Sequence, residues 1–147
     1  KTPHTGLVTA IDIGQVDNIH PTNKQELGRR IALVAERQIY GMKVTAAGPE
    51  PVSAVRRGAK VTVRFARSSS PLVFYGANRP VGFQLCDEEN RCQYVDAEER
   101  GGEIDLSPPK SLKASRVRYC WGDSPLCNVY NAAGLPAGPF ELPIAKR

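Results

Sequence analysis

The sequence predicts an α/β unit of strand, loop and helix over residues 1–42, followed by a β-rich, sandwich-like region over residues 43–147. Three patterns predict this fold class: a nearly continuous apolar run at residues 7–13, helically spaced apolar residues after Thr22, and alternating apolar and polar residues after Gly41. With 147 residues and 41% hydrophobic content, the chain can bury one good core or two small ones.

The N-terminal unit has the pattern of the closing part of an α/β domain. The run at residues 7–13 has the length and composition of a strand covered on both faces, and Gly14 ends it. The helix predicted next begins near Thr22, which forms a capping box with Gln25, and stops at Gly41. Its apolar stripe consists of Leu27, Ile31, Val34, Ala35 and Ile39. Because such a strand needs a larger sheet around it, we expect a fragment or a processed chain.

Short strands separated by turns are predicted in the rest of the chain. Val61, Val63 and Phe65 alternate with Thr62, Arg64 and Ala66. Further strand-like runs lie at residues 72–75, 81–86, 92–95, 103–106 and 116–121. The glycine, proline and serine clusters between them are spaced as in a sandwich-like sheet assembly.

The four cysteines fall in two close pairs, Cys86 with Cys92 and Cys120 with Cys127. Neither spacing matches the short Cys-x-x-Cys knuckles of zinc sites, and no histidine lies near either pair. Disulfides are the favoured interpretation, with free buried thiols as the alternative, and each small loop would add about 2 to 3 kcal/mol of stability. Disulfides imply an oxidising compartment, so we expect a periplasmic or secreted protein.

Charge and hydropathy exclude some partner classes. The net charge is +5, but the basic residues are scattered pairs without an aromatic platform, so no nucleic-acid partner is predicted. No apolar stretch approaches the roughly 20 residues needed to cross a bilayer, and no signal peptide is recognisable. The sequence therefore predicts no membrane association.

Asp17 and His20 are the candidate catalytic residues. They lie on the loop between the predicted strand and helix, where open α/β sheets place their sites. In a serine hydrolase, the imidazole takes the proton from a serine hydroxyl, and the carboxylate holds the imidazole in the correct tautomer. The alternative is that Asp17 caps the helix and His20 is a surface residue. His4, the other histidine, is expected to be an exposed terminal residue.

Ser124 is the tempting third member of a triad, because Gly122-Asp123-Ser124 resembles the nucleophile motif of one class of serine esterases. It ends a strand and precedes Pro125, however, whereas such a nucleophile opens a helix. A turn is therefore the favoured interpretation. Tyr119, Trp121 and Tyr130 could stack on a sugar ring, although core packing is favoured, and Asn128 and Asn131 are expected in turns.

Several stretches resemble sialate O-acetylesterases and related carbohydrate acetylesterases of the SGNH hydrolase superfamily. They are DIG at 12–14, DNIHPTNK at 17–24, GRRIA at 28–32, VRYCW at 117–121, NVYN at 128–131 and GLPAGPF at 134–140. The resemblance implies the terminal strand-loop-helix unit of an SGNH-type α/β/α domain at residues 1–42. It also implies an esterase that removes acetyl groups from sugars without a metal or other cofactor.

In this family His20 would be the general base and Asp17 its orienting carboxylate. The resemblance places the nucleophilic serine and the oxyanion donors upstream, so one expected partner is a serine-bearing part of the same enzyme. The other partner that the resemblance implies is an acetylated carbohydrate substrate. Ser53, Ser68 to Ser70, Ser107, Ser111 and Ser115 lack the required strand-turn-helix setting. The chain alone is therefore expected to be inactive.

The competing hypothesis is a non-catalytic β-sandwich module that binds carbohydrate or a protein partner. Residues 1–41 argue against it, because a free-standing module has no need of a buried strand that leads to an Asp-x-x-His loop. Without its sheet, this segment would also expose apolar surface.

Overall fold

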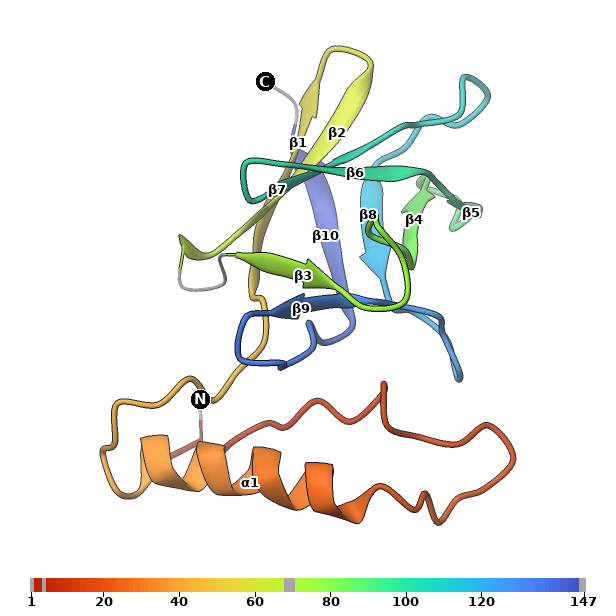
Figure 1. The fold of residues 1–147 in the computed structure, drawn as a ribbon. Coiled ribbons are helices and arrows are strands. Elements are labelled where there is room, and N and C mark those ends of the chain that lie inside the picture. Colours follow the sequence, from red (N-terminus) through yellow and green to blue (C-terminus); the bar gives the residue numbers. More distant parts are fainter. Residues whose placement is uncertain (1, 4, 68–70, 146–147) are drawn as a thin grey trace.

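A computed structural model of the chain describes residues 2–3, 5–67 and 71–145. Its fold is mostly β: an eight-stranded sheet, a two-stranded sheet and a single helix in the described ranges. The helix, α1 (Lys24–Gln38), and the segment before it lie beneath the β-rich region, which comprises residues 51–145 (Figure 1). His4 and Ser68 to Ser70 lie outside the described residues.

The large sheet curls into a half-barrel in place of the predicted pair of sandwiched sheets (Figure 1). Its strands, in spatial order, are β5 (Cys92–Tyr94), β4 (Phe83–Cys86), β8 (Arg116–Tyr119), β10 (Phe140–Ala145), β1 (Pro51–Arg57), β2 (Lys60–Phe65), β7 (Glu103–Leu106) and β6 (Ala97–Arg100). All neighbours are antiparallel except β1 and β10, which run parallel. The C-terminal strand thus joins the two halves of the sheet.

The core of the β-rich region is apolar and continuous. Its fully buried large residues are Val61, Val63, Phe83, Leu85, Ile104, Leu106, Val117, Tyr119 and Val129. The ring centroid of Tyr119 lies 4.7 Å from that of Phe83 and 5.3 Å from that of Phe140. The small sheet, β3 (Leu72–Phe74) paired with β9 (Val129–Asn131), packs on this core, and the Val129 amide donates to the Tyr119 hydroxyl at 2.9 Å.

The strand predictions were correct where residues alternate and incomplete elsewhere. Strands β3, β4, β5, β7 and β8 lie within the predicted runs and β2 begins one residue before its run, whereas β1, β6, β9 and β10 were not predicted. Strand β10 contains Pro143, which argues against a central strand. The Ile144 amide donates to the Ser115 carbonyl at 2.8 Å, so the Pro143 nitrogen points away from β8, and the ladder with β1 starts only at Ile144. The proline therefore interrupts neither ladder.

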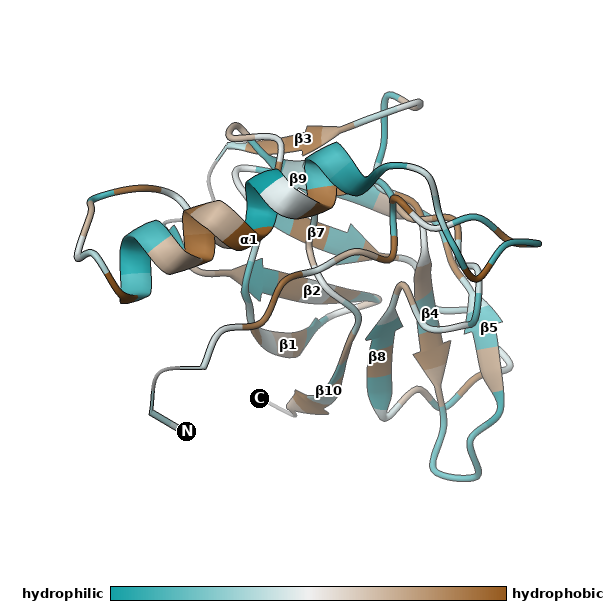
Figure 2. Cartoon of the chain, turned by 90° about the horizontal axis from the view of Figure 1, so that it is seen from below, coloured by the Kyte–Doolittle hydropathy of each residue, from teal (hydrophilic) through white to brown (hydrophobic). Residues whose placement is uncertain are grey.

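The strand predicted at residues 7–13 is absent, because no strand of the described chain lies beside it to complete a ladder. The predicted helix is confirmed, but its N-cap is Asn23, whose side chain accepts from the Glu26 amide at 3.3 Å, and not Thr22. Hydrophobic residues lie along α1 and the segment before it (Figure 2). No helix among the described residues is long and apolar enough to traverse a bilayer.

Both disulfides are confirmed, Cys86–Cys92 across the β4–β5 hairpin and Cys120–Cys127 around an exposed bend. The structure therefore agrees with disulfides and not with free thiols, and disulfides favour an oxidising compartment.

Core packing was the wrong expectation for Trp121. Strand β8 ends at Tyr119, Cys120 adopts a positive φ of 54°, and the Trp121 side chain turns outward, 45% exposed, beneath the Arg118 guanidinium.

Candidate functional site

Asp17 and His20 lie on an exposed loop, residues 13–22, which we call the Asp-His loop. Asn18 organises the turn of this loop. The Asn18 backbone amide donates to the Gln15 backbone carbonyl at 3.3 Å, and the Asn18 side-chain oxygen accepts from the His20 backbone amide at 2.8 Å. The His20 backbone is thus held by a local hydrogen bond, and the residue is exposed to solvent.

Asp17 and His20 share the loop but are not paired with each other in this conformation. No hydrogen bond or ion pair joins the Asp17 carboxylate to the His20 ring, and no serine of the described residues bonds to that ring. Ser124 lies in the exposed bend enclosed by the Cys120–Cys127 disulfide, which confirms the turn interpretation. The catalytic assignment of Asp17 and His20 therefore stays a prediction.

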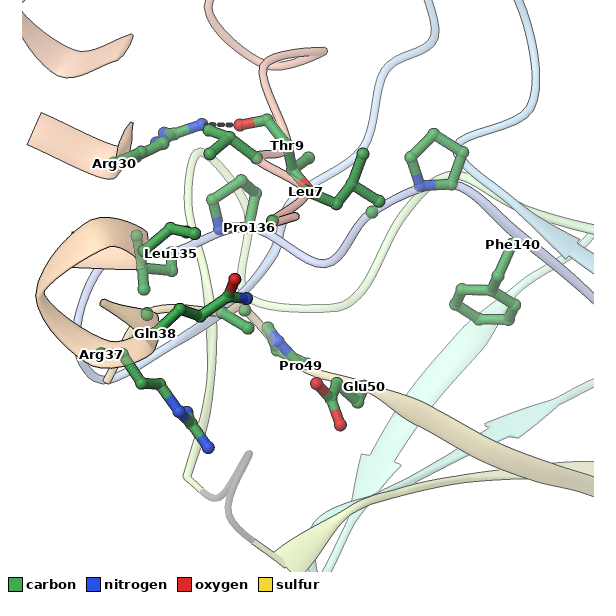
Figure 3. Close-up of a pocket in the computed structure, with 18 of the residues that line it drawn as sticks. Leu7, Thr9, Arg30, Arg37, Gln38, Pro49, Glu50, Leu135, Pro136 and Phe140 are labelled. Atoms are coloured by element: carbon green, nitrogen blue, oxygen red, sulfur yellow. Dashed lines mark hydrogen bonds between the residues drawn. The ribbon is translucent and has the colours of Figure 1, made fainter. Parts of the chain in front are cut away.

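A buried ion pair closes the base of the Asp-His loop. The Arg30 guanidinium binds both carboxylate oxygens of Asp12, at 2.6 and 2.7 Å, and the two side chains are only 5% and 7% exposed. Arg30 also donates to the Thr9 carbonyl oxygen at 2.8 Å, the bond drawn in Figure 3, and through Nε to Glu26 at 2.7 Å. Such two-pronged pairs fix geometry as well as charge.

Tyr130 connects this ion pair to the β-rich region. Its hydroxyl, carried by β9, donates to the Asp12 carboxylate at 3.0 Å, and its ring lies edge-on to Tyr75 with centroids 4.6 Å apart. Burial, reinforced by the negative charge of Asp12, raises the pKa of Tyr130 to about 12. The hydroxyl therefore remains a proton donor at any physiological pH.

The sequence carried a signal for these residues that the pattern analysis did not use. Arg30 falls among the apolar positions of its helix, between Leu27 and Val34, and Asp12 interrupts an apolar run. A charged residue at an apolar position indicates a buried partner, because an unpaired buried charge is very costly. The identity of the partner, and the part played by Tyr130, required the tertiary structure.

A cleft of about 810 Å³ opens between α1, the N-terminal segment and the β-rich region (Figure 3). It is lined by Thr2 and residues 5–9, 46–51, 135–136 and 138–140, together with the helix side chains Arg30, Val34, Arg37 and Gln38. Gly48 lies so close to the Pro136 carbonyl that no side chain would fit. Asp17 and His20 are not among the lining residues, so the cleft and the candidate catalytic loop are separate features.

Several large apolar residues of the N-terminal part of the chain are exposed, two of them within the Asp-His loop. Leu7, Val16 and Ile19 are largely exposed, Ile19 to 90%, and Ile31 on α1 is about half exposed. This confirms the expectation that the segment would expose apolar surface. No group of three or more metal-ligating side chains occurs within the described ranges.

The Glu26 carboxylate gives the helix a predicted sensitivity to acid. The hydrogen bond from Arg29, followed by that from Arg30, lowers the pKa of Glu26 from 4.5 to about 2. A carboxylate whose pKa is lower in the folded state stabilises the fold above its unfolded pKa and loses that effect as the pH falls towards the folded value. We therefore expect thermal stability to decrease between about pH 4.5 and pH 2.

Thermal unfolding recorded across this pH range checks the expectation. The Glu26→Gln variant should show a shallower decrease than the unmodified protein. Glu36→Gln is the matched control, because Glu36 lies on the same helix and forms no ion pair in the described part of the chain. Equal pH profiles for Glu26→Gln and the unmodified protein would contradict the assignment.

Comparison with known proteins finds distant similarity to carbohydrate acetylesterases. A crystal structure of a carbohydrate acetylesterase from Xanthomonas citri matches 88% of the chain with a TM-score of 0.78 and 30% sequence identity. Mouse sialate O-acetylesterase is 27% identical over 162 aligned positions that include the whole chain. The chain spans 30% of the length of each of these proteins. No protein-family profile matches the sequence.

Proposed function

We propose that the chain is part of a serine esterase that removes O-acetyl groups from carbohydrates, such as sialic acid or related glycans, and that it supplies Asp17 and His20 to the active site. The observation that carries the proposal is the similarity of the whole chain to two acetylesterases, one of which shares its fold over 88% of the chain. The nucleophilic serine is expected upstream or on another chain.

The chemistry assigned to these residues is proton transfer. His20 would take the proton from the serine hydroxyl as it attacks the acetyl carbonyl, then return it to the sugar oxygen that leaves. Water would repeat the sequence and release acetate. Asp17 would orient the ring and stabilise the imidazolium, which requires its carboxylate to approach a ring nitrogen of His20 in the assembled site.

The partner of this chain is proposed from its exposed apolar surface. Leu7, Val16 and Ile19 would dock onto the serine-bearing part, which would place His20 beside the nucleophile and withdraw apolar area from water. The two disulfides support a periplasmic or secreted location for the assembled enzyme.

Labelling of the complete protein with a fluorophosphonate, which reacts with activated serines, tests the proposal. We expect one labelled serine, located by peptide mapping outside residues 1–147, and release of acetate from an O-acetylated sugar. Ser124→Ala is the matched control and should retain both labelling and activity. Labelling of Ser124, or the absence of any acetate release, would contradict the proposal.

One observation favours a second candidate function, a module that binds carbohydrate without hydrolysing it. Trp121 is exposed at the end of β8 and could stack on a sugar ring. The same experiment separates the two functions. Binding of an acetylated sugar without release of acetate, and without labelling of any serine, would support the module.

A further inference from the structure

The Asp-His loop is held at both of its ends by a single side chain. Asp12 immediately precedes the loop, and Arg30 lies on the second turn of α1, the helix that follows it. Because Arg30 binds both oxygens of Asp12 and also the Thr9 carbonyl, it ties the segment that enters the loop to the helix that leaves it. The loop is therefore closed by three hydrogen bonds from Arg30, and the Arg30 and Asp12 side chains are almost fully buried.

Tyr130 extends this closure to the β-rich region. Among the described residues of the β-rich region, Tyr130 is the one whose side chain donates a hydrogen bond to Asp12, which lies 118 positions earlier in the sequence. Strand β9 holds Tyr130 firmly, since the neighbouring Val129 is fully buried and Asn131 is hydrogen-bonded to Ala47, Ala133 and Leu135. Tyr130 thus connects the base of the loop to a firmly packed part of the fold.

Catalysis by a His and Asp pair is sensitive to small displacements, since misplacement by about 1 Å can cost on the order of 100-fold in rate. An exposed loop held only by its own turn would not keep His20 at a fixed position relative to a serine carried by another segment. Supporting contacts behind the reacting side chains supply that rigidity. Asp12, Arg30 and Tyr130 have the burial and the geometry to supply it here.

We infer that Asp12, Arg30 and Tyr130 form a clamp that positions the Asp-His loop relative to the β-rich region, with Tyr130 as the positioning residue contributed by that region. The catalytic part of the inference rests on the proposed function. None of the three residues is assigned contact with the substrate. They act through the placement of Asp17 and His20.

The test uses Tyr130→Phe in the complete protein, because this change keeps the ring and its contact with Tyr75 but deletes the bond to Asp12. We expect amide hydrogen exchange in residues 13–22 to accelerate, kcat for acetyl ester hydrolysis to fall about 5- to 20-fold, and KM to stay within about 2-fold. Tyr94→Phe is the matched control, since Tyr94 is exposed and its hydroxyl makes no bond within the described residues.

A double variant tests whether Tyr130 acts on the loop through its hydrogen bond to Asp12. In an Asp12→Ala background, Tyr130→Phe should cause little further loss of kcat, because the carboxylate that accepts from the Tyr130 hydroxyl is already absent. Unchanged exchange in residues 13–22 would overturn the clamp whatever the activity. Accelerated exchange with unchanged kcat, in a protein that His20→Ala inactivates, would overturn the positioning role alone. Full activity of His20→Ala would instead overturn the proposed function and leave the clamp as a structural device.

Discussion

Alanine in place of His20 in the complete protein is expected to lower kcat for acetyl ester hydrolysis on the order of 10⁴- to 10⁶-fold, the effect of removing the general base of a serine triad. The ring is exposed and makes no side-chain hydrogen bond in the described residues, so its loss should leave the melting temperature unchanged. Initial rates of acetate release from an O-acetylated sugar, measured across substrate concentrations, give the effect on kcat and KM separately.

The Asp17→Asn variant is the companion measurement. An amide keeps the shape of the side chain but cannot stabilise the imidazolium, and we expect a loss of about 10⁴-fold in kcat. Asn18→Ala is a useful contrast, since it removes the bonds of the Asn18 side chain to the His20 backbone and to Gln15 but no proposed catalytic group, and it should have a smaller effect. Retained activity of His20→Ala, with acetate still released at the normal rate, would refute the assignment.

Truncation of Phe83 to alanine should cause the largest loss of stability in the β-rich region. Phe83 is fully buried on β4 and packs against Tyr119 and Phe140, so its removal leaves a cavity at the junction of β4, β8 and β10. Comparable truncations cost about 3 to 5 kcal/mol in free energy of unfolding. Urea denaturation, followed by the exchange protection of amides in β4 and β8, measures the loss for this region.

Val52→Ala is the control for this experiment. Val52 lies on β1 in the same sheet but is 60% exposed, so its truncation should change the free energy of unfolding by less than about 0.5 kcal/mol. Equal effects of the two substitutions would contradict the core described for the half-barrel.

Local sequence patterns predicted much of the fold, because helices, hairpins and short-range disulfides depend mainly on residues that are close in sequence. The helical stripe after Thr22 identified α1, and the hairpin around the Cys86–Cys92 pair placed β4, β5 and their disulfide. Strand β6 escaped prediction because Ala-Glu-Glu-Arg has little strand propensity. Strands β1 and β10 escaped because each contains a proline, and their parallel pairing joins residues about 90 positions apart.

The candidate site shows the same division. Asp17 and His20 were identified from residue types and spacing, which a sequence displays directly. The distant similarity to acetylesterases concerns the chain as a whole, and the catalytic roles of these two residues stay a prediction. The clamp was beyond sequence reasoning, because Asp12, Arg30 and Tyr130 lie on three separated segments that only folding brings together.

The sequence by itself determined the mostly β character of residues 51–145, the amphipathic helix, the cysteine pairs and the candidate catalytic residues, since each depends on neighbours within a few positions. Tertiary structure alone decided that residues 7–13 form no strand, that the sheet is one curled half-barrel, and that a buried Arg30 anchors the Asp-His loop. The physical reason is that ladder partners, burial and ion pairing are properties of distant segments in contact, and no local pattern specifies which segments meet.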